Sequence, residues 1–75
     1  MDEGYILSNK YIRTIFEGLV LGENNVKIIS KKHRIAPIIT KKIIDDLVKN
    51  KIIEKKGNLY QLTKEGEKLA SIIIG

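Results

Sequence analysis

The sequence predicts a mostly helical α+β fold with a three-helix core, a short two-stranded β-hairpin and a C-terminal helix. Two observations predict it. Apolar residues recur at helical spacing in four segments, and two short β-type runs flank Gly57-Asn58, a pair suited to a tight hairpin turn. The 75 residues contain no linker or repeat, so we expect one domain over residues 1–75. A core this small needs dense packing, and fifteen isoleucines supply much of it.

The first long helix is predicted over about residues 9–21. Ser8 is a suitable N-cap, Leu7 and Ile12 have the spacing of a hydrophobic staple, and Gly22 suits the end of a helix. The apolar positions that follow the cap share one helical face and are Ile12, Ile15, Phe16, Leu19 and Val20. This helix therefore supplies one side of the core.

Two further helices are predicted over about 26–34 and 37–50. The first begins after Asn24-Asn25, which offer a cap. The second begins at Pro37, whose missing N–H costs nothing at the first helical position. Two helices of this length joined by the short turn Arg34-Ile35-Ala36 form a helix-turn-helix pattern.

Each of these two helices has an inward face. On the first, we interpret His33, which shares a face with Val26 and Ile29, as a partly buried packing residue. On the second, the inward face is set by Ile43, Ile44, Leu47 and Val48. Its outward face is mixed and carries Ile38, Lys42, Asp45, Asp46 and Lys49, flanked by Ile39 and Lys41.

A hairpin over about 52–62 and a helix over about 64–73, capped by Thr63, complete the chain. The last residues, Ile72, Ile73 and Ile74, place more apolar surface at the end of the chain than one small core needs. Either the last helix packs back on the first long helix and the segment Tyr5-Ile6-Leu7, or it meets a second copy of the chain.

The positive charge is concentrated in one part of the chain. Residues 1–25 carry a net charge of −2, residues 26–56 carry +7, and residues 57–75 are neutral. The whole excess of +5 therefore lies on the helix-turn-helix and the hairpin. Such clustering is typical of a surface that binds a polyanion, although a lysine-rich composition that only solvates the surface is the alternative.

The sequence argues against several other classes of protein. It has no cysteine, one histidine and only scattered carboxylates, so we expect neither a metal site nor a cofactor. No nucleophile lies at a recognisable spacing from a base and no phosphate-binding loop is present, so we expect no enzymatic activity. The acidic start MDEGYIL does not resemble a signal peptide, and no apolar run reaches membrane length. We therefore expect a cytoplasmic protein.

The order of elements resembles the winged helix-turn-helix superfamily of prokaryotic transcription regulators, especially MarR-like and related small archaeal-type domains. The core positions that carry the resemblance are Ile29, Ile35, Ile44, Leu47, Ile52 and Ile53. The segment YQLTKEGEKLA, residues 60–70, is similar to the Leu-Thr-x-x-Gly-x-x-Leu segment that joins the hairpin, or wing, to the last helix in those proteins. The resemblance covers about residues 25–70 and implies DNA binding and transcription regulation.

Three positions depart from the family pattern. Arg34 and Lys51 stand where glycine is usual, so each must adopt a positive φ at some cost. The helix over 37–50, which would be the recognition helix, carries isoleucine, lysine and aspartate in place of the usual Ser, Arg and Thr. The resemblance therefore favours contacts to the DNA backbone over a base-reading code.

On this hypothesis the recognition helix enters the major groove and the wing lies on the backbone. Lysines of the preceding helix would face flanking phosphates, and an isoleucine at the start of the recognition helix could touch a thymine methyl group. The candidate DNA-binding residues are Lys27, Lys31, Lys32, Pro37, Ile38, Ile39, Lys41, Lys42, Lys55, Lys56 and Asn58. Asp45 and Asp46 would repel phosphate, but we prefer to interpret them as i,i+4 partners of Lys41 and Lys42.

A protein–protein interaction module without direct DNA binding is the alternative function. In that case Ile38, Ile39 and the C-terminal isoleucines would contact a protein partner, and the lysines would confer solubility. The resemblance to MarR-like domains also implies a homodimer that pairs through the terminal helices, at Ile72, Ile73 and Ile74.

Overall fold

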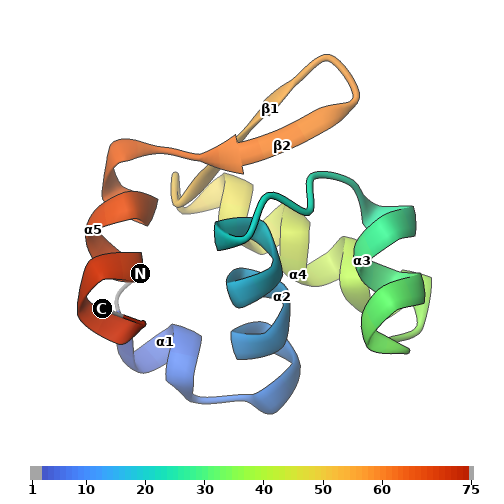
Figure 1. The fold of residues 1–75 in the computed structure, drawn as a ribbon, viewed down its shortest axis with the longest axis horizontal. Helices are drawn as coiled ribbons and strands as arrows, with labels where there is room; N and C mark the ends of the chain where they lie inside the picture. Colours follow the sequence, from blue (N-terminus) through green and yellow to red (C-terminus); the bar gives the residue numbers. More distant parts are fainter. Residues whose placement is uncertain (1–2, 75) are drawn as a thin grey trace.

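The computed structural model describes residues 3–74, and it confirms the mostly helical α+β fold (Figure 1). Its elements are α1 (Glu3–Leu7), α2 (Lys10–Val20), α3 (Val26–His33), α4 (Pro37–Lys49), β1 (Ile53–Lys56), β2 (Leu59–Leu62) and α5 (Lys64–Ile73). Helix α2 contacts each of the other four described helices and β2, so it forms the centre of the fold. The hairpin projects from one end of the helical body (Figure 1).

The core fills the space around α2. Phe16 and Ile15 of α2 are fully buried, together with Ile29 of α3 and Ile44 of α4. The other buried apolar residues are Ile6, Ile12, Leu19, Ile35, Ile43, Leu47, Ile52, Ile53 and Tyr60. Eleven of these thirteen side chains are isoleucine or leucine, which explains why the chain uses so many branched apolar residues.

The start of α2 differs from its prediction. Asn9, and not Ser8, is the N-cap: its Oδ1 accepts hydrogen bonds from the backbone N of Tyr11 (2.7 Å) and of Ile12 (3.4 Å). Ser8 follows α1 and donates its hydroxyl to the carbonyl of Tyr5 at 2.7 Å. The predicted staple through Leu7 is wrong, because Leu7 belongs to α1 and is 47% exposed.

Helix α1 was not predicted, because five residues are too few to display a helical period. Its Ile6 is fully buried in the core. Tyr5 lies beside Asp46 of α4, and burial together with that carboxylate raises the pKa of the Tyr5 hydroxyl. Helix α1 thereby packs against α2 and α5 and reaches α4 through Tyr5.

Helices α2, α3 and α4 end in the same way. Each is followed by a residue with positive φ: Gly22 (98°), Arg34 (54°) and Lys51 (62°). After each of these, the next backbone N–H donates to the carbonyl five residues earlier, at 3.0 or 3.1 Å, which is the Schellman arrangement. The positive φ predicted at Arg34 and Lys51 is confirmed, and in a non-glycine residue it costs about 1–2 kcal/mol.

The joint between the wing and α5 explains the Leu-Thr-x-x-Gly pattern. Thr63 caps α5 by accepting a hydrogen bond from the backbone N of Gly66, and its hydroxyl lies 2.6 Å from the carbonyl of Lys51. A side chain at Gly66 would overlap the carbonyl oxygen of Ile52. Threonine and glycine are therefore both needed for α5 to approach the chain segment that follows α4.

Strands β1 and β2 pair antiparallel with Lys56 opposite Leu59, so Gly57-Asn58 forms a two-residue turn. Gly57 has a φ of 63°, whereas Asn58 is not among the non-glycine residues with positive φ. A third segment joins the hairpin: the backbone N of Tyr60 donates to the carbonyl of Asn24 at 2.8 Å. The wing is thus fastened to the loop that precedes α3.

Candidate nucleic-acid interface

Two open grooves meet at the start of α3. The α3–wing groove is lined by Asn25, Val26, Lys27, Lys55, Asn58, Leu59 and Tyr60. The α3–α4 groove is lined by Val26, Lys27, Ser30, Lys31 and Pro37. Val26 and Lys27 line both, so the two grooves adjoin at the start of α3, and we call their joint lining the α3 surface. It brings together five of the residues predicted to bind DNA: Lys27, Lys31, Pro37, Lys55 and Asn58.

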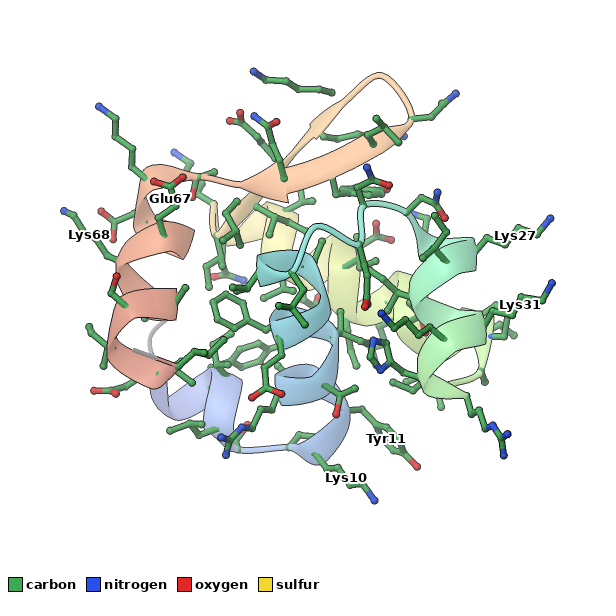
Figure 2. All side chains as sticks on the ribbon, viewed as in Figure 1. Lys10, Tyr11, Lys27, Lys31, Glu67 and Lys68 are labelled. Atoms are coloured by element: carbon green, nitrogen blue, oxygen red, sulfur yellow. The ribbon has the colours of Figure 1, made fainter. Side chains whose placement is uncertain are left out.

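The α3 surface is positively charged. Lys27 and Lys31 are exposed one helical turn apart, and both side chains extend outward from the same side of α3 (Figure 2). None of the described residues that line either groove is acidic. Lys68 of α5 lies on the opposite side of the molecule (Figure 2). A phosphate backbone placed against α3 would therefore meet lysines without a neighbouring carboxylate in the grooves.

The two wing lysines lie on opposite faces of the hairpin. Lys55 pairs with Tyr60 in the strand register and its Nζ lies 6.0 Å from the centre of the Tyr60 ring, on the side of the α3–wing groove. Lys56 shares the other face with Glu54, and Lys56 Nζ lies 3.7 Å from the Glu54 carboxylate. Lys55 is therefore the wing lysine that faces α3.

The outward side of α4 carries Ile38, Lys42, Asp45 and Lys49, as helical spacing predicts. Lys41 beside them donates to Asp45 Oδ1 at 2.6 Å, so the predicted i,i+4 pair is formed. The hydrogen bond from Lys41 to Asp45 also raises the pKa of Lys41. The second predicted pair, Lys42 with Asp46, is not among the ion pairs of the described residues, and Asp46 contacts Tyr5 instead.

Ile38, Ile39 and Lys42 border a separate hollow, which we call the α1–α4 groove. Its lining residues are Tyr5, Asn9, Tyr11, Ile12, Ile38, Ile39, Lys42, Ile43 and Asp46. The structure thus places most of the residues predicted to bind DNA on the α3 surface or on the exposed side of α4, whereas Lys56 lies on the other face of the hairpin and Lys32 lies beside Glu23.

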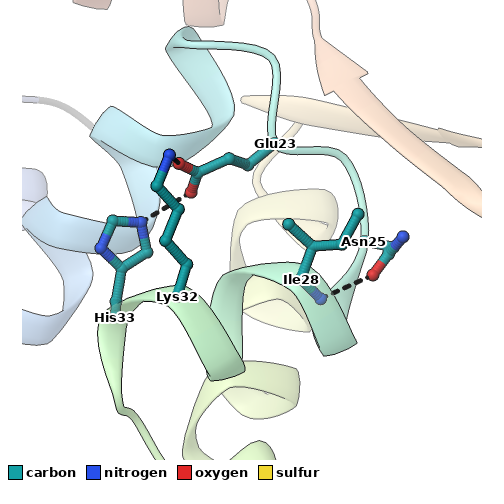
Figure 3. Close-up of polar contacts among 5 residues, drawn as sticks. All are labelled: Glu23, Asn25, Ile28, Lys32 and His33. Atoms are coloured by element: carbon teal, nitrogen blue, oxygen red, sulfur yellow. Dashed lines mark hydrogen bonds and ion pairs between the residues drawn. The ribbon is translucent and has the colours of Figure 1, made fainter.

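Lys32 has a different environment from Lys27 and Lys31. Its ammonium lies 2.8 Å from Oε2 of Glu23, and Oε1 of the same carboxylate lies 2.6 Å from Nε2 of His33 (Figure 3). The Glu23 side chain is only 8% exposed, whereas that of His33 is 23% exposed. His33 is therefore partly buried as predicted, but it is held by a carboxylate that sequence spacing did not connect to it. The charge of Lys32 is compensated within the protein.

Gly18 makes room for this cluster. A side chain at Gly18 would overlap Oε1 of Glu23 and lie 3.2 Å from Nε2 of His33. Burial by itself raises the pKa of the Glu23 carboxyl, but the neighbouring Lys32 and His33 outweigh burial, so the pKa lies below its usual value. Glu23 is therefore held as a carboxylate that joins the end of α2 to the last turn of α3.

Two exposed cations of this region were absent from the predicted set. Arg34 stands in the turn between α3 and α4, and Lys49 lies on the outward side of α4. The sequence prediction used Arg34 only for its backbone conformation and Lys49 only as part of the mixed outward face. Their exposure on the two helix-turn-helix elements is the signal that would have added them.

A helix-turn-helix followed by an antiparallel hairpin that packs beside it is a winged helix. The chain belongs to the winged helix-turn-helix family, since the model of this family matches residues 8–74. No curated protein and no solved structure matches the chain. Domains of this family are in general DNA-binding and typically not enzymes. Within residues 3–74, no helix is long and apolar enough to cross a membrane.

Proposed function

We propose that the protein binds duplex DNA mainly through its phosphate backbone. The α3 surface lies against one backbone, the outward side of α4 enters the major groove, and Lys55 of the wing follows the adjoining backbone. The observation that carries this proposal is the α3 surface itself, in which Lys27, Lys31 and Lys55 line joined grooves whose described lining residues include no carboxylate.

The expected binding mode follows from the side chains. Lysine is a point charge that binds phosphate well but discriminates between bases less sharply than the arginine fork. Lys32 and Lys41 are already paired with Glu23 and Asp45, so they contribute less than the unpaired lysines. We therefore expect affinity for duplex DNA of mixed sequence that depends strongly on salt.

Fluorescence anisotropy with a labelled mixed-sequence duplex tests this. Four to five lysine–phosphate contacts give an expected slope of about −4 in a plot of log affinity against log salt concentration. Replacing Lys27 and Lys31 together by glutamate should abolish binding. The matched control replaces Lys64 and Lys68 of α5 by glutamate, which changes the net charge equally. Equal losses in both double variants would contradict a defined interface, and absence of binding by the wild type at low salt would favour the protein-interaction module.

We further propose that the protein is a small transcription regulator. The resemblance of residues 60–70 to the segment that joins wing and last helix in MarR-like regulators supports this role. A regulator of this kind occupies particular sites, so selection of bound duplexes from a random pool should enrich a common sequence. Recovery of unrelated sequences would instead favour a protein that coats DNA.

We also propose that two copies pair through the C-terminal helix. Leu21, Ile72 and Ile74 are 78%, 63% and 48% exposed, and Leu21 and Ile74 line a common hollow. Leu69, Ala70 and Ile73 pack against the core, whereas Ile72 and Ile74 remain exposed beside them. Light scattering should give a dimer for the wild type and for Ile28→Asp, an exposed position on α3, but a monomer for Ile72→Asp. A monomeric wild type would contradict pairing.

A further inference from the structure

Ile38 is the most exposed large apolar side chain among the described residues, at 83%. It is the second residue of α4, and helical geometry places it at the centre of the outward side, between Asp45 and Lys42. An isoleucine in this position is not stabilised by burial in the protein's own core. Burial of its surface requires an external partner.

The neighbours of Ile38 provide few means of reading bases by hydrogen bonds. Residues 37–49 contain no arginine, asparagine or glutamine, the side chains that bind guanine or adenine with two hydrogen bonds. The ammonium of Lys41 is occupied by Asp45 at 2.6 Å. Lys42 and Lys49 are point charges suited to phosphate. The foremost group on the outward side of α4 is therefore an apolar one.

Charge complementarity indicates which partner covers Ile38. On its own helix the side chain lies between Lys42 and Asp45, whose charge is balanced by Lys41 at 2.6 Å, and the α3 surface adds Lys27 and Lys31. An apolar group in surroundings of net positive charge suits a polyanion that presents apolar atoms. Duplex DNA presents one such group in its major groove, the C5 methyl group of thymine.

We propose that Ile38 contacts a thymine methyl group, so that the protein selects duplexes with thymine opposite the start of α4. This inference rests on the proposed DNA binding and adds to it a base preference carried by one side chain. The preference is for a methyl group at C5 of a pyrimidine, so the methyl group of 5-methylcytosine should contact Ile38 as that of thymine does.

The test compares two duplexes of the same mixed sequence, one with thymine and one with deoxyuridine in its place, which lacks only the methyl group. The wild type should bind the thymine duplex about fourfold more tightly, the value expected for burying one methyl group. Ile38→Ala should bind both duplexes equally. Ile72→Ala, an exposed isoleucine on α5, should retain the wild-type ratio.

A third duplex provides a rescue. Replacing cytosine by 5-methylcytosine in the deoxyuridine duplex should restore affinity for the wild type and leave Ile38→Ala unchanged. If the wild type binds the thymine and deoxyuridine duplexes equally, the inference is overturned while DNA binding stands. Ile38 would then be assigned to a contact with a protein at the α1–α4 groove. Absence of binding to every duplex overturns both proposals.

Discussion

Nε2 of His33 lies 2.6 Å from Oε1 of Glu23, and this contact fastens the last turn of α3 to the residue that closes the end of α2. Glu23 serves twice, because its backbone N also donates to the carbonyl of Gly18 at 3.0 Å. The helix that supplies Lys27 and Lys31 is thus positioned against α2 by a nearly buried carboxylate as well as by apolar packing. The arrangement of the α3 surface therefore depends on a residue outside it.

Replacing Glu23 by glutamine should lower the free energy of unfolding by about 1–2 kcal/mol near neutral pH, because a neutral amide cannot form the ion pair with Lys32 and is a weaker partner for His33. Urea denaturation measures the loss. The control is Glu17→Gln, whose carboxylate pairs with Arg13 at an exposed site, and its loss should stay within a few tenths of a kcal/mol. Similar losses in the two variants would contradict a structural role for Glu23.

The stabilisation by Glu23 should depend on pH. Its pKa in the folded protein is lowered from the ordinary value of 4.5, so the contribution is fully present above that value. It is lost as the pH falls through the lowered pKa of the folded state, because protonation then removes the charge that pairs with Lys32. The stability difference between wild type and Glu23→Gln should accordingly disappear in acid, and a difference that persists there would contradict the ion-pair explanation.

Replacing Gly18 by alanine should change stability in opposite directions in two backgrounds. Helix propensity alone favours alanine by up to about 1 kcal/mol. In the wild type the added methyl group overlaps the Glu23 carboxylate, so the variant should be less stable. In a Glu23→Ala background the carboxylate is gone and the His33 ring, 3.2 Å away, is no longer held by it, so Gly18→Ala should be stabilising. A double-mutant cycle of denaturation midpoints measures this, and two effects of the same sign would contradict it.

Glycine at position 51 should stabilise the protein by about 0.5–1 kcal/mol, because it relieves the positive φ of Lys51 while adding some unfolded-state entropy. Thermal unfolding measures the gain. Lys49→Gly is the control, since residue 49 lies within α4 and should be destabilised instead. A loss of stability in Lys51→Gly would contradict backbone strain at this position.

Arg34→Gly should also stabilise the fold, because Arg34 has a positive φ as well. It should weaken DNA binding, because it removes an exposed cation beside the α3 surface.

The wing lysines should differ in their effect on DNA affinity. Lys55→Gln removes the lysine that faces α3 and should lower affinity several-fold and reduce the salt dependence by about one contact. Lys56→Gln removes the same charge from the opposite face, beside Glu54, and should have a smaller effect. Anisotropy titrations at two salt concentrations would separate the two, and equal effects would mean that the hairpin meets DNA edge-on.

Local signals predicted much of the fold. Pro37 and Thr63 mark the starts of α4 and α5, and Gly22 marks the end of α2, because caps and turn residues act through neighbouring backbone atoms. The prediction of Ser8 in place of Asn9 as the N-cap failed because both are good caps and Ser8 lies directly after α1, where its hydroxyl donates to the carbonyl of Tyr5.

The candidate site was less accessible to sequence reasoning. The pairing of Glu23 with Lys32 and His33, nine and ten residues later, depends on how α3 packs against α2, so no local pattern reports it. The difference between Lys55 and Lys56 could have been inferred, since alternate residues of a strand face opposite sides. Only the structure shows which side of the hairpin faces α3.

The hydrogen bond from the Tyr60 amide to the carbonyl of Asn24 has a consequence for the kinetics of binding. A two-stranded hairpin alone is marginally stable in water, but this bond and the buried Tyr60 ring hold the wing at a fixed distance from α3 before any partner arrives. Binding to a rigid double helix then costs little conformational entropy in the wing. Most encounters between protein and DNA should therefore find the wing already in its bound position. Slow hydrogen exchange of the Tyr60 amide in the free protein would be the signature of this preorganisation.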